Sequence, residues 1–261
     1  MDSFESLLIQ KRDGVAILTI NRPEKLNALN DRVMDELDAA FASLASDAEV
    51  RGVVLTGAGE KAFVAGADIG ELSRETPVSG KEKSIRGQRV LDRIENLGKP
   101  VVAAVNGFAL GGGCELAMAC HLRVASQNAR LGTPEVKLGL MCGYAGTQRL
   151  ARLVGKGRAL EILLTGEPVD AAEAHRIGLV NKVVAKDELL AEAEGLVRKM
   201  IANAPVSLRF SIEAVNAGLE MTFDEAQHLE ATLFGLLCTT EDMKEGTRAF
   251  LEKRQAKFQG K

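Results

Sequence analysis

The chain contains no tryptophan and only one tyrosine, and histidine and cysteine are also scarce. The three histidines are scattered, and the four cysteines form no C-x-x-C pair. Metal-binding motifs repeat such ligands at short fixed spacings, so we expect no bound metal. Isolated cysteines predict free thiols in a reducing compartment rather than a disulfide framework. The four cysteines are Cys114, Cys120, Cys142 and Cys238.

Long apolar runs and a strong net charge are absent too. No stretch approaches the ~18 unbroken apolar residues of a membrane span. The segment from Met1 to Asp13 carries acidic residues and lacks the apolar run of a secretory signal. The formal net charge of −3 gives no bulk electrostatic reason to bind nucleic acid or an anionic membrane. We therefore expect a cytoplasmic protein without a nucleic-acid or membrane partner.

The remaining composition is that of a globular protein, with 46% hydrophobic and 26% charged residues in a chain of 261. Such a length can bury a full core as one large domain or one domain with an appendage. Strand candidates at Gly14 to Ile20, Val50 to Thr56 and Pro100 to Val105 alternate with helical segments. This alternation predicts an α/β fold.

Helical periodicity is clearest after Asn30, which we expect to be an N-cap. The apolar residues that follow at helical spacing are Val33, Leu37, Phe41 and Leu44.

Two further segments are interpreted from their composition. The polar segment from Arg74 to Lys83 contains proline and glycine and is predicted to be an exposed loop. From Thr147 onward the chain is nearly all helical. Its last three helix candidates are Val206 to Gly218, Thr222 to Cys238 and Glu241 to Phe258.

The stretch from Asn106 to Arg123, NGFALGGGCELAMACHLR, follows the third strand candidate. A strand, a glycine turn and a helix in this order point backbone N–H groups at an anionic oxygen. A dinucleotide fingerprint fails because Leu116 stands at its last position, and no Walker A lysine is present. Glu115 lies in the first turn of the predicted helix. A glycine-rich helix start whose carboxylate only favours the helix dipole remains the alternative.

A second stretch, Lys61 to Leu72 (KAFVAGADIGEL), follows the strand candidate that ends at Thr56. It again supplies small residues at a turn, Ala65-Gly66-Ala67-Asp68. Two such turns after two strands could each direct one N–H group at the same oxygen.

Four motifs occur in order: KAFVAGADIGEL, NGFALGGGCELAMAC, GTPEVKLGL and GTQRLARLVG. Together they strongly resemble the enoyl-CoA hydratase/isomerase (crotonase) family over nearly the whole chain. The resemblance implies a spiral of repeated ββα units, with strands in two stacked sheets, and a C-terminal helical domain that packs against neighbouring subunits. We assign residues 1–197 to the spiral core and 198–261 to the helical domain, and we expect a homotrimer or a homohexamer of two trimers.

The resemblance implies hydration of short to medium trans-2-enoyl-CoA esters. The backbone N–H groups of Ala67 and Gly112 would stabilise the enolate-like thioester oxygen. Glu115 would activate water and Glu135 would protonate the α-carbon. Asp68 more simply holds the turn or caps the next helix, so it is not counted as catalytic.

Further substrate contacts are implied by resemblance. They involve an acyl-CoA thioester, so coenzyme A is part of the substrate and no separate cofactor is expected. For Lys25 and Lys253, ordinary solvated charge is the alternative. The predicted substrate-binding residues are Lys25, Leu26, Ala65, Asp68, Ile69, Gly111 and Tyr144, with Phe250 and Lys253 in the C-terminal helix of a neighbouring subunit.

Three residues depart from the family pattern. His121 stands where aspartate is common and is interpreted as structural. Cys142 replaces a common proline, and Tyr144 replaces a small residue, both in the loop after Glu135. The acyl pocket could therefore differ from that of a general short-chain hydratase, although a core role for the Tyr144 ring is equally compatible with the sequence.

Two other functions are compatible with this family. A Δ3,Δ2-enoyl-CoA isomerase could work with one glutamate and little water. A non-catalytic RNA-binding or scaffold protein would need neither glutamate. The presence of both Glu115 and Glu135 favours the hydratase, and the mild acidity of the chain disfavours RNA binding.

Overall fold

The computed structural model describes residues 4–261. The first three residues of the segment from Met1 to Asp13, which we predicted not to be a secretory signal, lie outside the described residues. Its core is a six-stranded sheet with the strand order β1-β2-β3-β5-β7-β10. The strands run parallel except for β1, which pairs antiparallel with β2. They are β1 (Leu7–Arg12), β2 (Val15–Ile20), β3 (Gly52–Gly57), β5 (Val101–Val105), β7 (Leu122–Ser126) and β10 (Lys182–Val184).

A second, four-stranded sheet has the order β4-β6-β8-β9. Its strands are short: β4 (Ala62–Val64), β6 (Phe108–Leu110), β8 (Arg130–Gly132) and β9 (Val169–Asp170). Three times the chain passes from a strand of the large sheet to one of the small sheet and then into helices: β3 to β4, β5 to β6 and β7 to β8. This repetition confirms the predicted spiral of ββα units.

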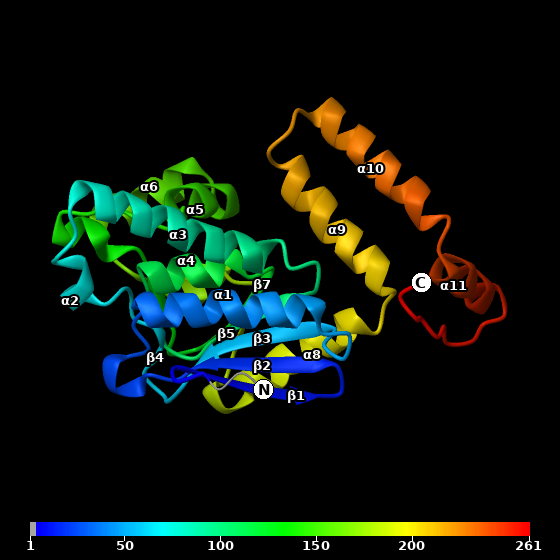
Figure 1. Ribbon diagram of the computed structural model, residues 1–261, viewed down its shortest axis with the longest axis horizontal. Coiled ribbons are helices and arrows are strands. Elements are labelled where there is room, and N and C mark those ends of the chain that lie inside the picture. Colours follow the sequence, from blue (N-terminus) through cyan, green and yellow to red (C-terminus); the bar gives the residue numbers. More distant parts are fainter. Residues whose placement is uncertain (1–3) are drawn as a thin grey trace.

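Helices cover both sheets and continue beyond them (Figure 1). Three short 3-10 helices, η1 (Pro23–Lys25), η2 (Pro134–Leu138) and η3 (Lys186–Glu188), connect the elements. The α-helices are α1 (Asp31–Ser46), α2 (Ile69–Leu72), α3 (Pro77–Glu95), α4 (Gly112–Ala119), α5 (Gly146–Val154), α6 (Lys156–Thr165), α7 (Ala171–Arg176), α8 (Leu189–Ile201), α9 (Pro205–Gly218), α10 (Phe223–Leu237) and α11 (Glu241–Leu251).

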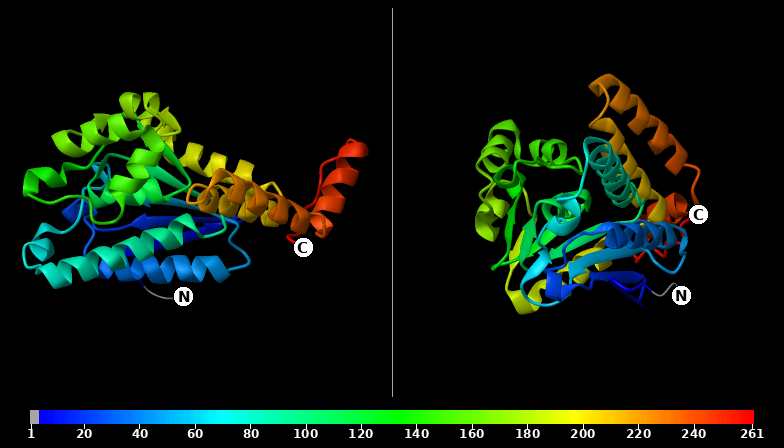
Figure 2. Two further views of the ribbon diagram at one scale, coloured as in Figure 1. Left: turned by 90° about the horizontal axis from the view of Figure 1, so that it is seen from above. Right: turned by 60° about the vertical axis from the view of Figure 1, so that its left-hand side comes forward.

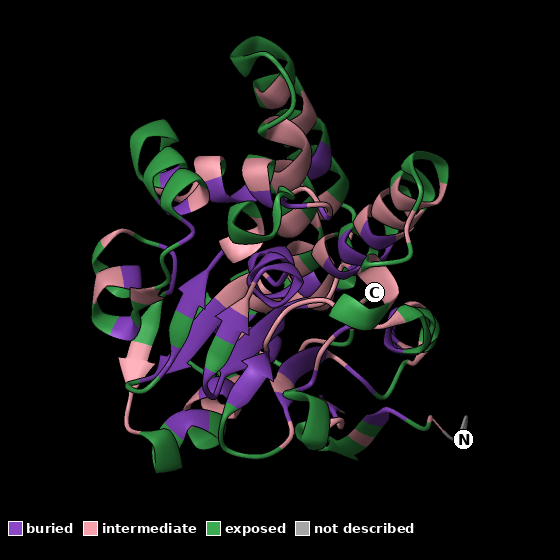
Figure 3. Cartoon of the chain, turned by 90° about the vertical axis from the view of Figure 1, so that its left-hand side faces the viewer, coloured by how far each residue is buried: buried purple, intermediate pink, exposed green. Residues whose placement is uncertain are grey.

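The main core lies between the two sheets and the helices α1, α3 and α4, and the strands are largely buried in Figure 3. Every residue of α4 is buried. On the opposite face of the large sheet, valines such as Val54 and Val102 pack against α8, where Val197 is fully buried. The helix that carries Glu115 is therefore fixed on all sides.

The structure confirms the predicted start of α1. The Asn30 side chain accepts a hydrogen bond from the Val33 N–H, as an N-cap does. The four predicted apolar residues of α1 are all buried.

The predicted loop from Arg74 to Lys83 is wrong, because α3 already begins at Pro77. Thr76 and Ser79 form a reciprocal capping box. Proline at the first helical position has no N–H that needs a partner. The proline was thus a helix-start signal rather than a loop signal.

The helices α9, α10 and α11 project from the core as an arm (Figures 1 and 2). The helix α9 has no buried residue and α10 has one, Leu233. The predicted boundary between the spiral core and the helical domain, after residue 197, falls within α8. This domain boundary stays a prediction. The last helix ends at Leu251 rather than near Phe258, so Lys253 lies in the turn beyond it with a φ of 55°. Among residues 4–261, no helix has the length and apolar character needed to cross a membrane.

Candidate active site

A cavity of about 340 Å³ lies where the two glycine-rich stretches meet. Its walls come from the turn after β4, from α2 and α3, from the start of α4 and from the loop that follows Glu135. Eight of the predicted site residues line it: Ala65, Ala67, Ile69, Gly111, Gly112, Glu115, Glu135 and Tyr144. The sequence motifs therefore converge on one cavity.

Two backbone N–H groups at this cavity are available for a ligand. Ala67 lies in the turn after β4, and Gly112 is the first residue of α4. Neither N–H donates to an acceptor within residues 4–261. Gly111, which directly precedes Gly112, has φ 51° and ψ −124°, a conformation that residues with a side chain rarely adopt. Together with the N-terminal end of α4, these donors favour negative charge on a bound oxygen.

Glu115 lines the cavity but is only 2% exposed. Its Oε1 accepts hydrogen bonds from the backbone N–H groups of Tyr144 at 2.8 Å and Gly146 at 2.7 Å. A Cβ atom on Gly146 would lie 2.7 Å from the Glu115 Cγ, so the loop can approach only because Gly146 has no side chain. Burial raises the pKa of Glu115 to about 7, and the two hydrogen bonds offset part of that effect.

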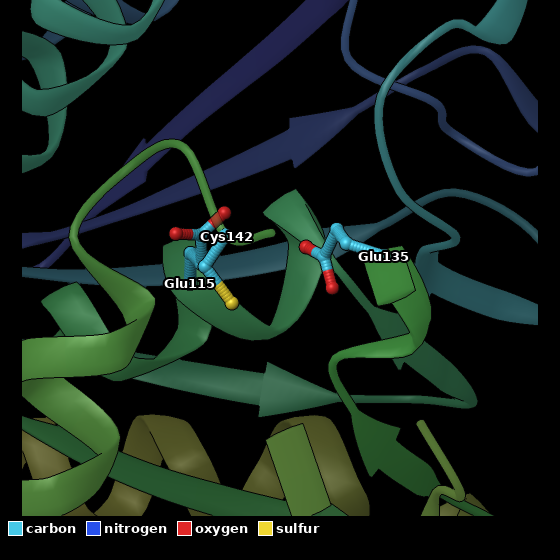
Figure 4. A group of neighbouring side chains, drawn as sticks. All are labelled: Glu115, Glu135 and Cys142. Carbon is cyan, nitrogen blue, oxygen red and sulfur yellow. The ribbon is translucent and has the colours of Figure 1, made fainter. Parts of the chain in front are cut away.

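Glu135 enters the cavity from η2, on a different element from Glu115 (Figure 4). Its Oε2 is shielded from solvent and has no hydrogen-bond partner within the described residues. Burial raises the pKa of Glu135. A buried carboxyl oxygen without a partner favours the protonated acid and is ready to receive a ligand atom.

The two carboxyl groups lie close enough to share one small molecule. Glu115, Glu135 and Cys142 each present one atom within 4.8 Å of the other two. Since a water oxygen lies roughly 2.7–2.8 Å from each hydrogen-bonded oxygen, carboxyl oxygens within 4.8 Å of each other are within reach of one bridging water. Two raised carboxyl pKa values near one centre are what acid–base chemistry at neutral pH requires.

The same three residues are a possible set of metal donors that the sequence spacings did not reveal. A thiophilic ion such as zinc requires Cys142 as a thiolate. Burial and the neighbouring charges of Glu115 and Glu135 raise the pKa of that thiol, which opposes thiolate formation. We therefore interpret the cluster as an acid–base site.

The other predicted residues lie outside this cavity. Lys25 and Leu26 are exposed on and beside η1, although the Leu26 carbonyl accepts a hydrogen bond from the Ala65 N–H. The Asp68 side chain caps α2 and lies 3.6 Å from Arg22, which supports its structural interpretation. Phe250 and Lys253 belong to the exposed arm, at the opposite end of the molecule from α2 in Figure 1.

Within residues 4–261, both ring nitrogens of His121 form hydrogen bonds with backbone groups. Its Nδ1 accepts a hydrogen bond from the Val101 N–H, so its Nε2 carries the proton and donates to the Glu95 carbonyl. Burial lowers the pKa of His121, which favours this neutral form. The structural interpretation of this residue is supported.

The sequence interpretation missed two residues that line the cavity, Lys83 and Ser84, and one that contacts Glu115 from behind it, Gly146. Lys83 and Ser84 line the cavity from α3, whose first turns were predicted as a loop. Gly146 was visible only as one of several loop glycines. The motif GTQRLARLVG, which begins at Gly146, contributes to the family resemblance. Nothing in it indicates that Gly146 contacts Glu115.

The chain is similar to known proteins along nearly its whole length. The model of the enoyl-CoA hydratase/isomerase family matches residues 10–261. Short-chain-enoyl-CoA hydratase of Clostridium acetobutylicum is 49% identical over 250 residues, which cover 96% of each chain. Crotonyl-CoA hydratase of Syntrophomonas wolfei is 46% identical over 256 residues, or 98% of each. The crystal structure of enoyl-CoA hydratase from Bacillus anthracis matches with a TM-score of 0.95 at 35% identity, covering 98% of this chain and 100% of the other. The chain belongs to the enoyl-CoA hydratase/isomerase family.

Proposed function

We propose that the chain adds water across the 2,3-double bond of trans-2-enoyl-CoA thioesters to give 3-hydroxyacyl-CoA. The observation that carries this proposal is the pair Glu115 and Glu135, which face one cavity with two unbonded N–H groups in its wall. The relatives named as short-chain-enoyl-CoA hydratase and crotonyl-CoA hydratase support the same reaction.

The thioester carbonyl would accept hydrogen bonds from the N–H groups of Ala67 and Gly112. Addition at the β-carbon moves charge onto the carbonyl oxygen, and these donors stabilise that charge. Loss of one donor from such a pair typically costs ~10²–10³ in rate.

The proton transfers would be divided between the two glutamates. Glu115 takes a proton from water while the water oxygen bonds to the β-carbon. Glu135 delivers a proton to the α-carbon. The products contain the atoms of water and thioester only, so this chemistry calls for no separate cofactor. The raised pKa of Glu135 suits a proton donor, and the two backbone N–H donors on Glu115 suit its ionised form.

An isomerase that shifts a double bond needs one proton carrier and no nucleophilic water. Two acid–base groups within 4.8 Å favour the hydratase over that alternative. A non-catalytic RNA-binding or scaffold role gives no reason to bury two carboxyls at one cavity.

The CoA portion would leave the cavity past Ala65, Asp68 and Ile69 toward Lys25 and Leu26. Ile69 and Leu26 are both exposed there and offer apolar surface to the pantetheine. Phe250 and Lys253 would contact CoA from a neighbouring subunit, because the arm of their own chain lies far from the cavity.

We extend the proposal to a homotrimer or a homohexamer, located in the cytoplasm. The arm supports the assembly, since Phe223, Phe234, Phe250 and Leu251 are each at least 69% exposed. Large exposed apolar patches mark interaction surfaces.

The direct test is to incubate the protein with crotonyl-CoA and to measure the loss of the absorbance of the conjugated enoyl thioester. We expect 3-hydroxybutanoyl-CoA as the product. A protein that binds CoA esters but hydrates none of a series of enoyl-CoAs would contradict the proposal.

A further inference from the structure

The single tyrosine of the chain forms part of the cavity wall. Tyr144 is 6% exposed, lines the cavity and also belongs to the main core. Its backbone N–H donates to the Glu115 Oε1. The residue therefore lies directly beside one of the two carboxyl groups.

The ring of Tyr144 is wedged between two glycines on different helices. A Cβ atom on Gly87 of α3 would lie 2.2 Å from the ring atoms Cδ1 and Cε1. A Cβ atom on Gly112 of α4 would lie 3.3 Å from Cε2, on the other edge of the ring. The ring thus spans the gap between α3 and the residue whose N–H is expected to bind the thioester oxygen.

The backbone around the ring is tied to α3 as well. The Gly143 carbonyl accepts hydrogen bonds from the Ser84 hydroxyl and from Gln88 Nε2. The Tyr144 carbonyl accepts from Arg149 Nη1 at 2.8 Å, and the Arg149 guanidinium pairs with Asp92 and Glu95 of α3. These contacts hold the backbone that carries the ring against α3.

We propose that the Tyr144 ring, fixed between Gly87 and Gly112, is the end wall of the acyl pocket and restricts the enzyme to short acyl chains. The inference rests on the proposed hydratase function. With the thioester oxygen at Ala67 and Gly112 and the reacting carbons between the glutamates, carbons beyond the β-position meet the ring. Substrates of the size of crotonyl-CoA fit, and chains of eight carbons collide with it.

The test compares Tyr144→Ala with Tyr144→Phe, which keeps the ring and removes only the hydroxyl. The kcat/KM values for trans-2-butenoyl-, hexenoyl- and octenoyl-CoA are measured for both variants and the wild type. We expect the octenoyl-to-butenoyl ratio to rise by ~10-fold or more in Tyr144→Ala, since one methylene in an apolar pocket changes discrimination by roughly 10–200-fold. Tyr144→Phe should keep the wild-type ratio. A ratio that stays unchanged in Tyr144→Ala would overturn the proposal.

A binding measurement separates this proposal from the hydratase proposal. Dissociation constants of butanoyl-CoA and octanoyl-CoA are measured for the same proteins, without any chemical step. Tyr144→Ala should strengthen octanoyl-CoA binding relative to butanoyl-CoA, even if loss of the ring displaces Gly112 and lowers turnover. If the wild type binds both esters but hydrates no enoyl-CoA, the hydratase proposal fails while the wall is still tested. Equal relative affinities in wild type and Tyr144→Ala would refute the wall itself.

Discussion

Gly113 lies so close to Val64 that a Cβ atom on Gly113 would stand 2.0 Å from the Val64 carbonyl oxygen. The start of α4 thereby packs directly on the end of β4. Because Gly112 precedes this contact and Ala67 follows Val64 by three residues, the contact brings the two N–H groups to one cavity. The geometry that we propose for binding the thioester oxygen therefore depends on the absence of a side chain at Gly113.

Gly113→Ala should therefore separate α4 from β4. Overpacking of a core typically costs 1–3 kcal/mol, and here the clash is with backbone, which cannot rotate away. We expect a lower thermal midpoint and a large loss of hydration activity, measured by thermal unfolding and by the crotonyl-CoA assay.

Gly195→Ala is the matched control. Gly195 lies in α8 and a Cβ atom there would contact nothing within 4 Å. Since alanine favours a helix interior over glycine by roughly 0.5–1 kcal/mol, this variant should be slightly more stable and fully active. Equal tolerance of both substitutions would show that the close contact is not required.

The buried carboxyl of Glu115 should cost the protein stability at neutral and alkaline pH. Its pKa is raised from 4.5 to about 7 on folding, so between these values the folded chain binds more protons than the unfolded chain. Stability linked to Glu115 is therefore complete below about pH 4.5 and is lost as the pH rises through 7. Glu115→Gln, whose amide oxygen can still accept from Tyr144 and Gly146, should unfold at a higher temperature than the wild type at pH 8.

That difference should shrink as the pH is lowered to 5. Glu82→Gln is the control, because it makes the same chemical change at an exposed position on α3. It should show no comparable dependence on pH. A Glu115→Gln effect of the same size at pH 5 and pH 8 would argue against a raised pKa in the folded protein.

The exposed apolar residues of the arm should be covered in solution. We expect sedimentation to give a trimer or a multiple of three at micromolar concentration. Phe234→Asp should weaken this assembly, since Phe234 is 69% exposed within a single chain. A wild-type monomer at that concentration would refute the assembly and remove the contribution of Phe250 and Lys253 from a neighbour.

The fold and the local site motifs could be predicted, because strands, caps and glycine turns leave signals within a few residues. Asn30 is such a local signal for the start of α1, and the glycines around Gly112 are such a signal for the backbone N–H donors. The strands of the small sheet are only two or three residues long, too short for periodicity to reveal. The predicted loop at Arg74 to Lys83 failed because Pro77 punctuates both loops and helix starts.

The environment of the carboxyl groups could not be predicted from local sequence. Glu115 is bonded by N–H groups about thirty residues away, and this contact exists only because α5 begins with a glycine. The proximity of Cys142 to both glutamates depends on the same loop closure. The sequence left Tyr144 open between a pocket residue and a core residue. In the structure it lines the cavity and also belongs to the main core, while its contact with the acyl chain stays a proposal.

The two-glutamate mechanism predicts that Glu115→Gln and Glu135→Gln each lose hydration by roughly 10²–10⁴, the usual effect of removing a general acid or base. The double variant should lose less than the product of the two, because both carboxyl groups serve one transition state. Glu135→Gln should also suppress exchange of the α-proton of a saturated acyl-CoA in heavy water more than Glu115→Gln does.

The most direct measurement is the rate of crotonyl-CoA hydration by these two single variants, with Glu82→Gln as the charge-matched control and butanoyl-CoA binding as the check on folding. Our account predicts that both site variants bind butanoyl-CoA nearly as the wild type does and hydrate crotonyl-CoA at least about 100-fold more slowly, while the control is unaffected. Near-normal hydration by either site variant would contradict the assignment of Glu115 and Glu135 as the acid–base pair.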